Sequence, residues 1–113
     1  MRFAFTVLGP ARGKQRPRVT SHGTYTPKQT REYERAVRGM ARLLRPHDWP
    51  LDRRYRLRVE FTGRCDADNV VKACADALQT VLYDNDRQVD EMSAARVHGG
   101  DARTQITVEV LDV

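Results

Sequence analysis

The chain has 113 residues, of which 40% are hydrophobic and 31% are charged. This length excludes a second core of useful size, and the composition excludes an intrinsically disordered chain. No apolar run approaches the ~20 residues that span a bilayer, and the short apolar stretch at the start alternates like a strand rather than a signal peptide. We therefore expect one domain over residues 1–113 that works inside the cell, in the cytoplasm, away from membranes.

The net charge of +5 is unevenly distributed along the chain. Residues 1–60 hold 15 Lys and Arg against 5 Asp and Glu, whereas residues 61–113 hold 5 against 10. A basic half indicates a polyanionic partner. An acidic half beside it would repel DNA unless divalent metal ions neutralise its carboxylates. This asymmetry favours a nuclease.

The first half of the chain predicts a strand, a basic loop and a helix. Residues 2–8 alternate as a strand, and both of its faces could be buried. Residues 9–27 are rich in Gly, Pro, Ser and Thr and predict a long loop. Apolar residues then recur at helical spacing over 28–45, so we expect an amphipathic helix there. Five arginines spaced by four and three share its opposite face: Arg31, Arg35, Arg38, Arg42 and Arg45.

The second half predicts three further strands and one helix. The helix has apolar residues on more than one side, which indicates burial on more than one side. These elements follow in chain order as a strand over 53–62, a helix over 68–82, a strand over 88–97 and a strand over 104–111. The order βαβαββ predicts an α+β (mixed α/β) fold, a mixed sheet packed against two helices.

The densest chemical signal surrounds the second predicted helix. Asp66 and Asp68 stand two residues apart at its entry, so both carboxylates can face one cavity. Lys72 is the i+4 neighbour of Asp68 and shares its helical face. Asp86 lies past the other end of a helix ~20 Å long, so it reaches the cluster only if the following strand returns alongside the helix start.

These residue types suit phosphodiester hydrolysis. Mg²⁺ prefers hard oxygen ligands, and two or three aspartates without Cys or His provide them. The bound ion acts as a Lewis acid and activates water. Lys72 would offset carboxylate repulsion, orient the nucleophilic water or meet the scissile phosphate. Taken alone, the Asp-x-Asp pattern is usually a helix cap, and Asp68 with Lys72 a surface pair; the joint pattern beside an arginine-rich half favours an active site.

Two strings resemble the RusA family of Holliday junction resolvases. The string CDADNVVKACADALQTVLYDNDRQV contains its D-x-D-N-x-x-K, D-A-L and acidic-x-Q-V motifs, and GKQRPRVTSHGTYTP followed by KQTREYE resembles its N-terminal region. Together they cover well over half of the chain. The resemblance implies a crossover junction endodeoxyribonuclease that depends on Mg²⁺, with Mn²⁺ as a substitute, and that cuts branched DNA as a homodimer in recombination and repair.

The family's site residues carry over by position. Asp66, Asp68 and Asp86 match its essential metal-binding aspartates, and Lys72 matches the lysine implicated in catalysis. The family often has two acidic residues before x-Q-V, and this chain has Asn85 before Asp86, so Asp84 remains a possible substitute ligand. The resemblance implies supporting roles for two further residues of the motif. Asn69 is expected to be structural or to support a ligand, and Asp76 to support the site or to form a salt bridge.

Basic residues of the predicted loop are candidate DNA contacts. Lys14, Arg16 and Arg18 alternate in an extended segment, which directs them to one side. With the family resemblance we predict a phosphate clamp, and a solvated loop is the alternative. The arginines of the first helix and of the strand over 53–62 are either DNA contacts or an ordinary solvated face. Tyr25 either stacks on an unpaired base or pins the loop to the core.

Paired cuts in a four-way junction require two symmetric active sites, which a two-fold homodimer supplies. Two other functions remain open from the sequence. One is a metal-dependent nuclease for flaps, replication forks or RNA, and the other is a DNA-binding module without catalysis.

Overall fold

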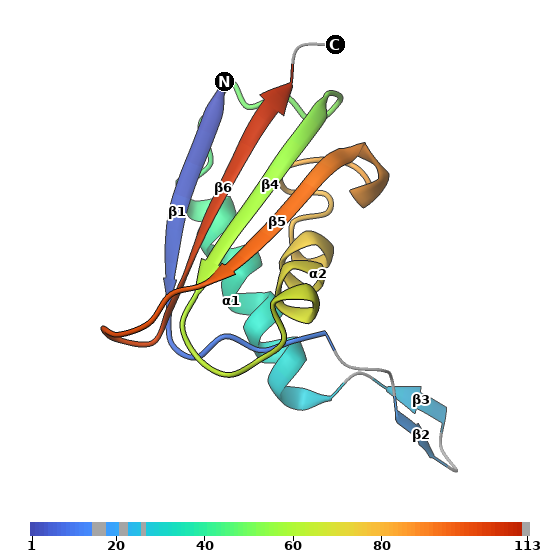
Figure 1. The fold of residues 1–113 in the computed structure, drawn as a ribbon. Coiled ribbons are helices and arrows are strands. Elements are labelled where there is room, and N and C mark those ends of the chain that lie inside the picture. Colours follow the sequence, from blue (N-terminus) through green and yellow to red (C-terminus); the bar gives the residue numbers. More distant parts are fainter. Residues whose placement is uncertain (15–17, 21–22, 26, 112–113) are drawn as a thin grey trace.

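A computed structural model describes residues 1–14, 18–20, 23–25 and 27–111 of the chain. It confirms the predicted α+β fold with two helices on a four-stranded mixed sheet (Figure 1). The elements in chain order are β1 (Arg2–Leu8), β2 (Arg18–Thr20), β3 (Gly23–Tyr25), α1 (Lys28–Leu44), β4 (Arg54–Phe61), α2 (Ala67–Ala77), the 3₁₀ turn η1 (Asp86–Gln88), β5 (Val89–Arg96) and β6 (Arg103–Leu111).

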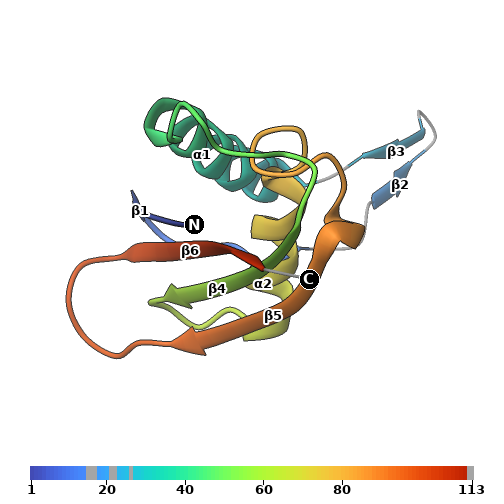
Figure 2. The ribbon, with the colours of Figure 1, turned by 90° about the horizontal axis from the view of Figure 1, so that it is seen from above.

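The four-stranded sheet has the order β1-β6-β4-β5, and β2 pairs only with β3 in a small separate hairpin. β6 is antiparallel to both of its neighbours, whereas β4 and β5 are parallel. Parallel neighbours need a long crossover connection, and α2 provides it. Both helices lie on the same face of the sheet (Figure 2). Within the described residues, neither helix is long and apolar enough to cross a membrane.

Strand β1 is buried on one face only, which corrects the expectation that both faces could be buried. Phe3, Phe5 and Val7 point toward the helices and are buried, whereas Leu8 on the other face is 81% exposed. The physical reason is the single helical layer: nothing in the described part of the chain covers the other face of the sheet, so that face keeps its polar and charged side chains.

Helix α2 ends at Ala77, five residues before the predicted end at Leu82. Thr80 has a φ of 69°, which a continuing right-handed helix does not allow. The apolar pattern continues because the turn itself is buried: Tyr83 Oη donates to the Ala75 carbonyl at 2.7 Å, and Trp49 Nε1 donates to the Leu82 carbonyl at 2.9 Å. These bonds fix the course of the chain from α2 to η1.

The predicted loop over 9–27 contains β2 and β3, which the sequence did not indicate. Apart from the C-terminal end of α2, the predicted helices and strands lie within two residues of their predicted bounds, which is the usual uncertainty at element ends. Both cysteines are free thiols, and burial raises the pKa of Cys74 to about 12.

Candidate active site

The two carboxylates at the start of α2 are exposed and are not used as helix caps. Asp66 is the N-cap residue, in an extended conformation, and its side chain makes no capping hydrogen bond. Asp68 lies in the first turn, with 80% of its side chain exposed. A carboxylate at a helix start ordinarily bonds to the free N–H groups there. Because neither carboxylate does so here, both remain open to a ligand.

Lys72 lies one turn further along the same face, as predicted. Its Nζ is 3.5 Å from Asp68 Oδ2, and its side chain is 59% exposed. A pair this exposed stabilises the fold by at most a few tenths of a kcal/mol. The pair therefore contributes little to folding, and its ammonium group is available to an anionic substrate beside the two carboxylates.

Asp86 lies at the opposite end of α2. It begins η1, and its backbone N–H donates to Gln79 Oε1 at 3.3 Å, just beyond the helix end. The 11 residues of α2 separate it from Asp66 by about 16 Å of helix. Among the described residues, no three His, Cys, Asp or Glu side chains come close enough to hold one metal ion. The three predicted ligands therefore do not meet within one chain.

Strand β5 does return alongside the start of α2, but it brings a different residue there. Arg96, at the end of β5, donates to the carbonyls of Gly63 and Cys65 at 2.9 and 2.7 Å. Asp86 precedes β5 and so stays at the far end. Because α2 and β5 run in opposite directions, the residues before each element lie at opposite ends of the pair.

Gln88 holds the segment that carries Asp84 and Asp86. Its Oε1 accepts from the backbone N–H groups of Asp84 and Asn85, both at 2.9 Å. Its Nε2 donates to the carbonyls of Leu51 and Arg53 at 2.8 and 2.9 Å. In the sequence, Gln88 appeared only as the glutamine of the acidic-x-Q-V motif, and no structural role was predicted for it. Its four bonds make it the residue that fixes the acidic turn to the start of β4.

Lys14, one of the three predicted phosphate contacts, is held by two carboxylates. Its Nζ is 2.8 Å from Glu34 Oε1 on α1 and 3.0 Å from Asp76 Oδ2 on α2. Burial lowers the pKa of Lys14, but the hydrogen bonds to Glu34 and Asp76 outweigh burial and raise this pKa above its ordinary value of 10.5. Asp76 thus has the salt-bridge role that the sequence left open. The side chains of Arg16, Arg18 and Tyr25 lie outside the described residues.

The residues around Lys14 fasten the base of the basic loop to α2. The Lys14 N–H donates to the Asn69 carbonyl at 2.8 Å, and Thr30 Oγ1 donates to the Gly13 carbonyl at 3.2 Å. A Cβ on Gly13 would lie 2.9 Å from Asn69 Cβ, so only glycine allows this approach. The backbone of Asn69 therefore supports the base of the loop, and the loop leaves from a fixed point beside Asp68.

For several arginines, the sequence left open whether they contact DNA or face solvent. In the structure, these side chains bond to other residues of the chain. Two of the five arginines of the first predicted helix donate to backbone carbonyls. Arg38 Nε, on α1, donates to Ala77, the last residue of α2, at 3.1 Å, and Arg45 Nη1, just after α1, donates to Val81, beyond the end of α2, at 2.7 Å. Their side chains therefore reach toward α2, which corrects the expectation of a uniform opposite face. The arginines of β4 form ion pairs with carboxylates across the open face of the sheet: Arg54 with Asp90, Arg56 with Glu91 and Glu109, and Arg58 with Glu60.

Replacing Lys14 by methionine is expected to lower the free energy of unfolding by about 1–3 kcal/mol, because Glu34 and Asp76 then face each other unneutralised. Urea denaturation at pH 7 measures this loss. Lys28→Met is the control, since Lys28 forms an exposed pair with Glu32 on the same helix. Because the pKa of Lys14 is raised on folding, its contribution is complete below pH 10.5 and declines as the pH rises through the folded-state pKa. The contrary result is a Lys14→Met protein that keeps wild-type stability and binds DNA more weakly and with less dependence on salt. That result would indicate that Lys14 contacts a DNA phosphate.

Comparison with known proteins assigns the chain to a family. The family model described as Endodeoxyribonuclease RusA matches residues 9–109. A search of curated proteins finds no match. The matched range contains both helices, the exposed carboxylates at the start of α2, Lys72 and the turn held by Gln88. Because the match spans most of its length, the chain belongs to the RusA endodeoxyribonuclease family, whose members are nucleases that act on DNA junctions.

Proposed function

We propose that this protein resolves Holliday junctions by paired, symmetric phosphodiester cleavage in DNA recombination and repair. The observation that carries the proposal is the start of α2, where Asp66, Asp68 and Lys72 are exposed and contribute almost nothing to the stability of the fold. Family membership supplies the class of reaction. An intracellular location follows from a DNA substrate.

The donor groups at this site fit a magnesium ion. Mg²⁺ keeps several waters and is commonly bound by one or two carboxylates together with substrate phosphates. Asp66 and Asp68 would hold it, with Mn²⁺ as a substitute. The bound ion supplies Lewis acidity and lowers the pKa of a bound water. Lys72 would place its positive charge against the phosphate that approaches the two carboxylates.

A homodimer would complete the site. In a two-fold dimer with the α2 helices antiparallel, the start of one helix lies beside the end of the other. Asp86 of one chain would then approach Asp66 and Asp68 of its partner, and the symmetry would create two such sites. Met92 on the neighbouring β5 is 42% exposed and offers apolar area to this contact. Asp84 lies in the same turn and remains the substitute for Asp86.

Arg16 and Arg18 are proposed to contact phosphates. Arg16→Ala is expected to weaken junction binding for all sequences and to make the slope of log K against log[salt] shallower by roughly 0.9, the value for one lost phosphate contact. Binding titrations at several salt concentrations measure this slope. Arg35→Ala on the exposed side of α1 is the matched control. A wild-type slope for Arg16→Ala would remove this residue from the DNA interface.

Cleavage assays in Mg²⁺ with a four-way junction, a fork, a linear duplex and a structured RNA test the proposed function. We expect paired cuts in the junction and little cleavage of the linear duplex. Preference for the fork or the RNA would indicate a nuclease with another substrate. Junction binding without cleavage of any substrate would indicate a DNA-binding module.

A further inference from the structure

The outer edge of β1 has free backbone hydrogen-bonding groups. Gly9 N–H donates to the Ala102 carbonyl at 2.9 Å and Val110 N–H donates to the Met1 carbonyl at 2.8 Å, so the odd-numbered residues of β1 point their backbone groups toward β6. In an antiparallel pair the alternate residues point both groups away. Within the described part of the chain, these outward groups have no strand partner, since β1 is the end of the sheet. They belong to Arg2, Ala4, Thr6 and Leu8.

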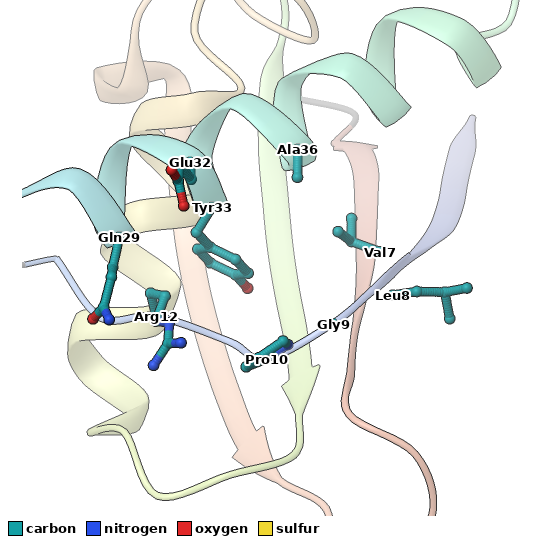
Figure 3. A pocket seen from close by; sticks show the side chains of 9 residues that line it. All are labelled: Val7, Leu8, Gly9, Pro10, Arg12, Gln29, Glu32, Tyr33 and Ala36. Carbon is teal, nitrogen blue, oxygen red and sulfur yellow. The ribbon is translucent and has the colours of Figure 1, made fainter.

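A groove lies between α1 and the C-terminal end of β1, from Thr6 to Leu8. Its apolar part has a volume of about 720 Å³ and continues into a smaller part of about 280 Å³, whose lining is less apolar. In Figure 3, Val7 and Ala36 point into the space between strand and helix, whereas Leu8 points away from it. The helix side of the apolar part is formed by Ala36, Gly39, Met40 and Leu43, and Leu43 is 75% exposed.

The two edges of the sheet differ in their protection. Charged side chains protect sheet edges against pairing with other chains. The edge strand β5 carries Asp90, Glu91 and Arg96, all exposed. Among the outward residues of β1, only Arg2 is charged. The β1 edge is thus the one that a further strand can extend.

We propose that the β1 edge and its groove bind an extended segment of a partner protein, which adds a fifth strand to the sheet. The segment would pair its backbone with the outward groups of β1 and place alternate apolar side chains against Met40 and Leu43. The proposed binding surface shares no residue with the nuclease site, so its test is independent of the proposed function.

The size of this surface favours a short segment over a second copy of the chain. The apolar part of the groove is lined by only three residues of β1, Thr6 to Leu8, which span about 10 Å, and by four residues of α1. Each partner in a standard protein–protein interface contributes about 800 Å². A strip this small cannot alone hold two folded domains together, whereas it matches the footprint of one strand.

Hydrogen exchange followed by NMR tests the proposal residue by residue. In the free protein, the amides of Ala4, Thr6 and Leu8 are expected to exchange rapidly and those of Phe3, Phe5 and Val7 slowly. The probe is the peptide Thr-Val-Thr-Val-Thr-Val-Thr. At saturation it should slow exchange at the even positions at least tenfold, and the same peptide with N-methylated amides should not. Unchanged exchange at the even positions would overturn the proposal. Slow exchange at the even positions in the absence of peptide, together with a concentration-dependent dimer, would also overturn the proposal. It would indicate that the β1 edge pairs with a second copy of this chain.

Two substitutions sharpen this test. Thr6→Pro removes an outward N–H without breaking the β1–β6 ladder, and Leu43→Lys places a charge in the groove. Each should weaken peptide binding at least tenfold in fluorescence anisotropy. Leu44→Lys is the matched control, because Leu44 is exposed but does not line the groove. Equal effects at residues 43 and 44 would exclude the groove as the binding site.

Discussion

Asp66→Asn and Asp68→Asn are each expected to reduce Mg²⁺-dependent junction cleavage by about 10³-fold or more, because each removes a carboxylate proposed to hold the ion. Junction affinity should stay near the wild-type value, since both side chains are exposed and neither supports the fold. Cleavage rates under single-turnover conditions and a gel-shift titration in Ca²⁺ measure the two quantities. Cleavage at the wild-type rate in either variant would remove that residue from the site.

Mixing two inactive proteins tests whether the site is shared between chains. Asp86→Asn and the double variant Asp66→Asn/Asp68→Asn should each be inactive alone. A dimer containing one chain of each has one complete site and one site without any of the three carboxylates. It should therefore nick one strand of the junction without resolving it.

No recovery on mixing, with exchange of subunits verified, would show that Asp86 does not serve the partner's site. Asp84→Asn is then the informative variant, because Asp84 lies in the same turn. If that variant loses cleavage and Asp86→Asn keeps it, Asp84 is the third acidic residue.

Gln88→Met is expected to reduce cleavage by about 10²-fold and the free energy of unfolding by about 2–4 kcal/mol. The substitution removes four hydrogen bonds of about 1 kcal/mol each and releases the turn that carries Asp86. Chemical denaturation and single-turnover cleavage measure the two effects. Gln105→Met on the open face of the sheet is the control. If Gln88→Met cuts normally despite the stability loss, the position of Asp86 is unimportant for catalysis.

Regular periodicity explains which parts of the fold the sequence predicted. The alternation in β4 and the 3.6-residue period of α1 each reflect one buried face, so the sequence located both within two residues. The same signal failed after Ala77. There the buried Leu82 and Tyr83 continue the apolar pattern of α2 through a turn, and burial alone does not distinguish a helix from a buried turn.

The candidate site was predicted where local spacing determines geometry. Asp68 and Lys72 share a face because they are one helical turn apart, which the structure confirms. The position of Asp86 depends on which way the chain leaves α2, and spacing carries no such information. The two ion pairs of Lys14 escaped the sequence for a related reason: its partners Glu34 and Asp76 come from two other elements, so the sequence around Lys14 shows only a basic loop.

The parallel pairing of β4 with β5 has a consequence for the dose of this enzyme. In a strand–helix–strand crossover, the residue before the helix and the residue before the second strand lie at opposite ends of the sheet. A site that needs both residues is absent from every isolated chain. If two chains share the site as proposed, the amount of complete enzyme below the dissociation constant of the dimer grows with the square of the protein concentration. A tenfold lower concentration of a protein assembled in the proposed way would leave about a hundredth of the complete sites.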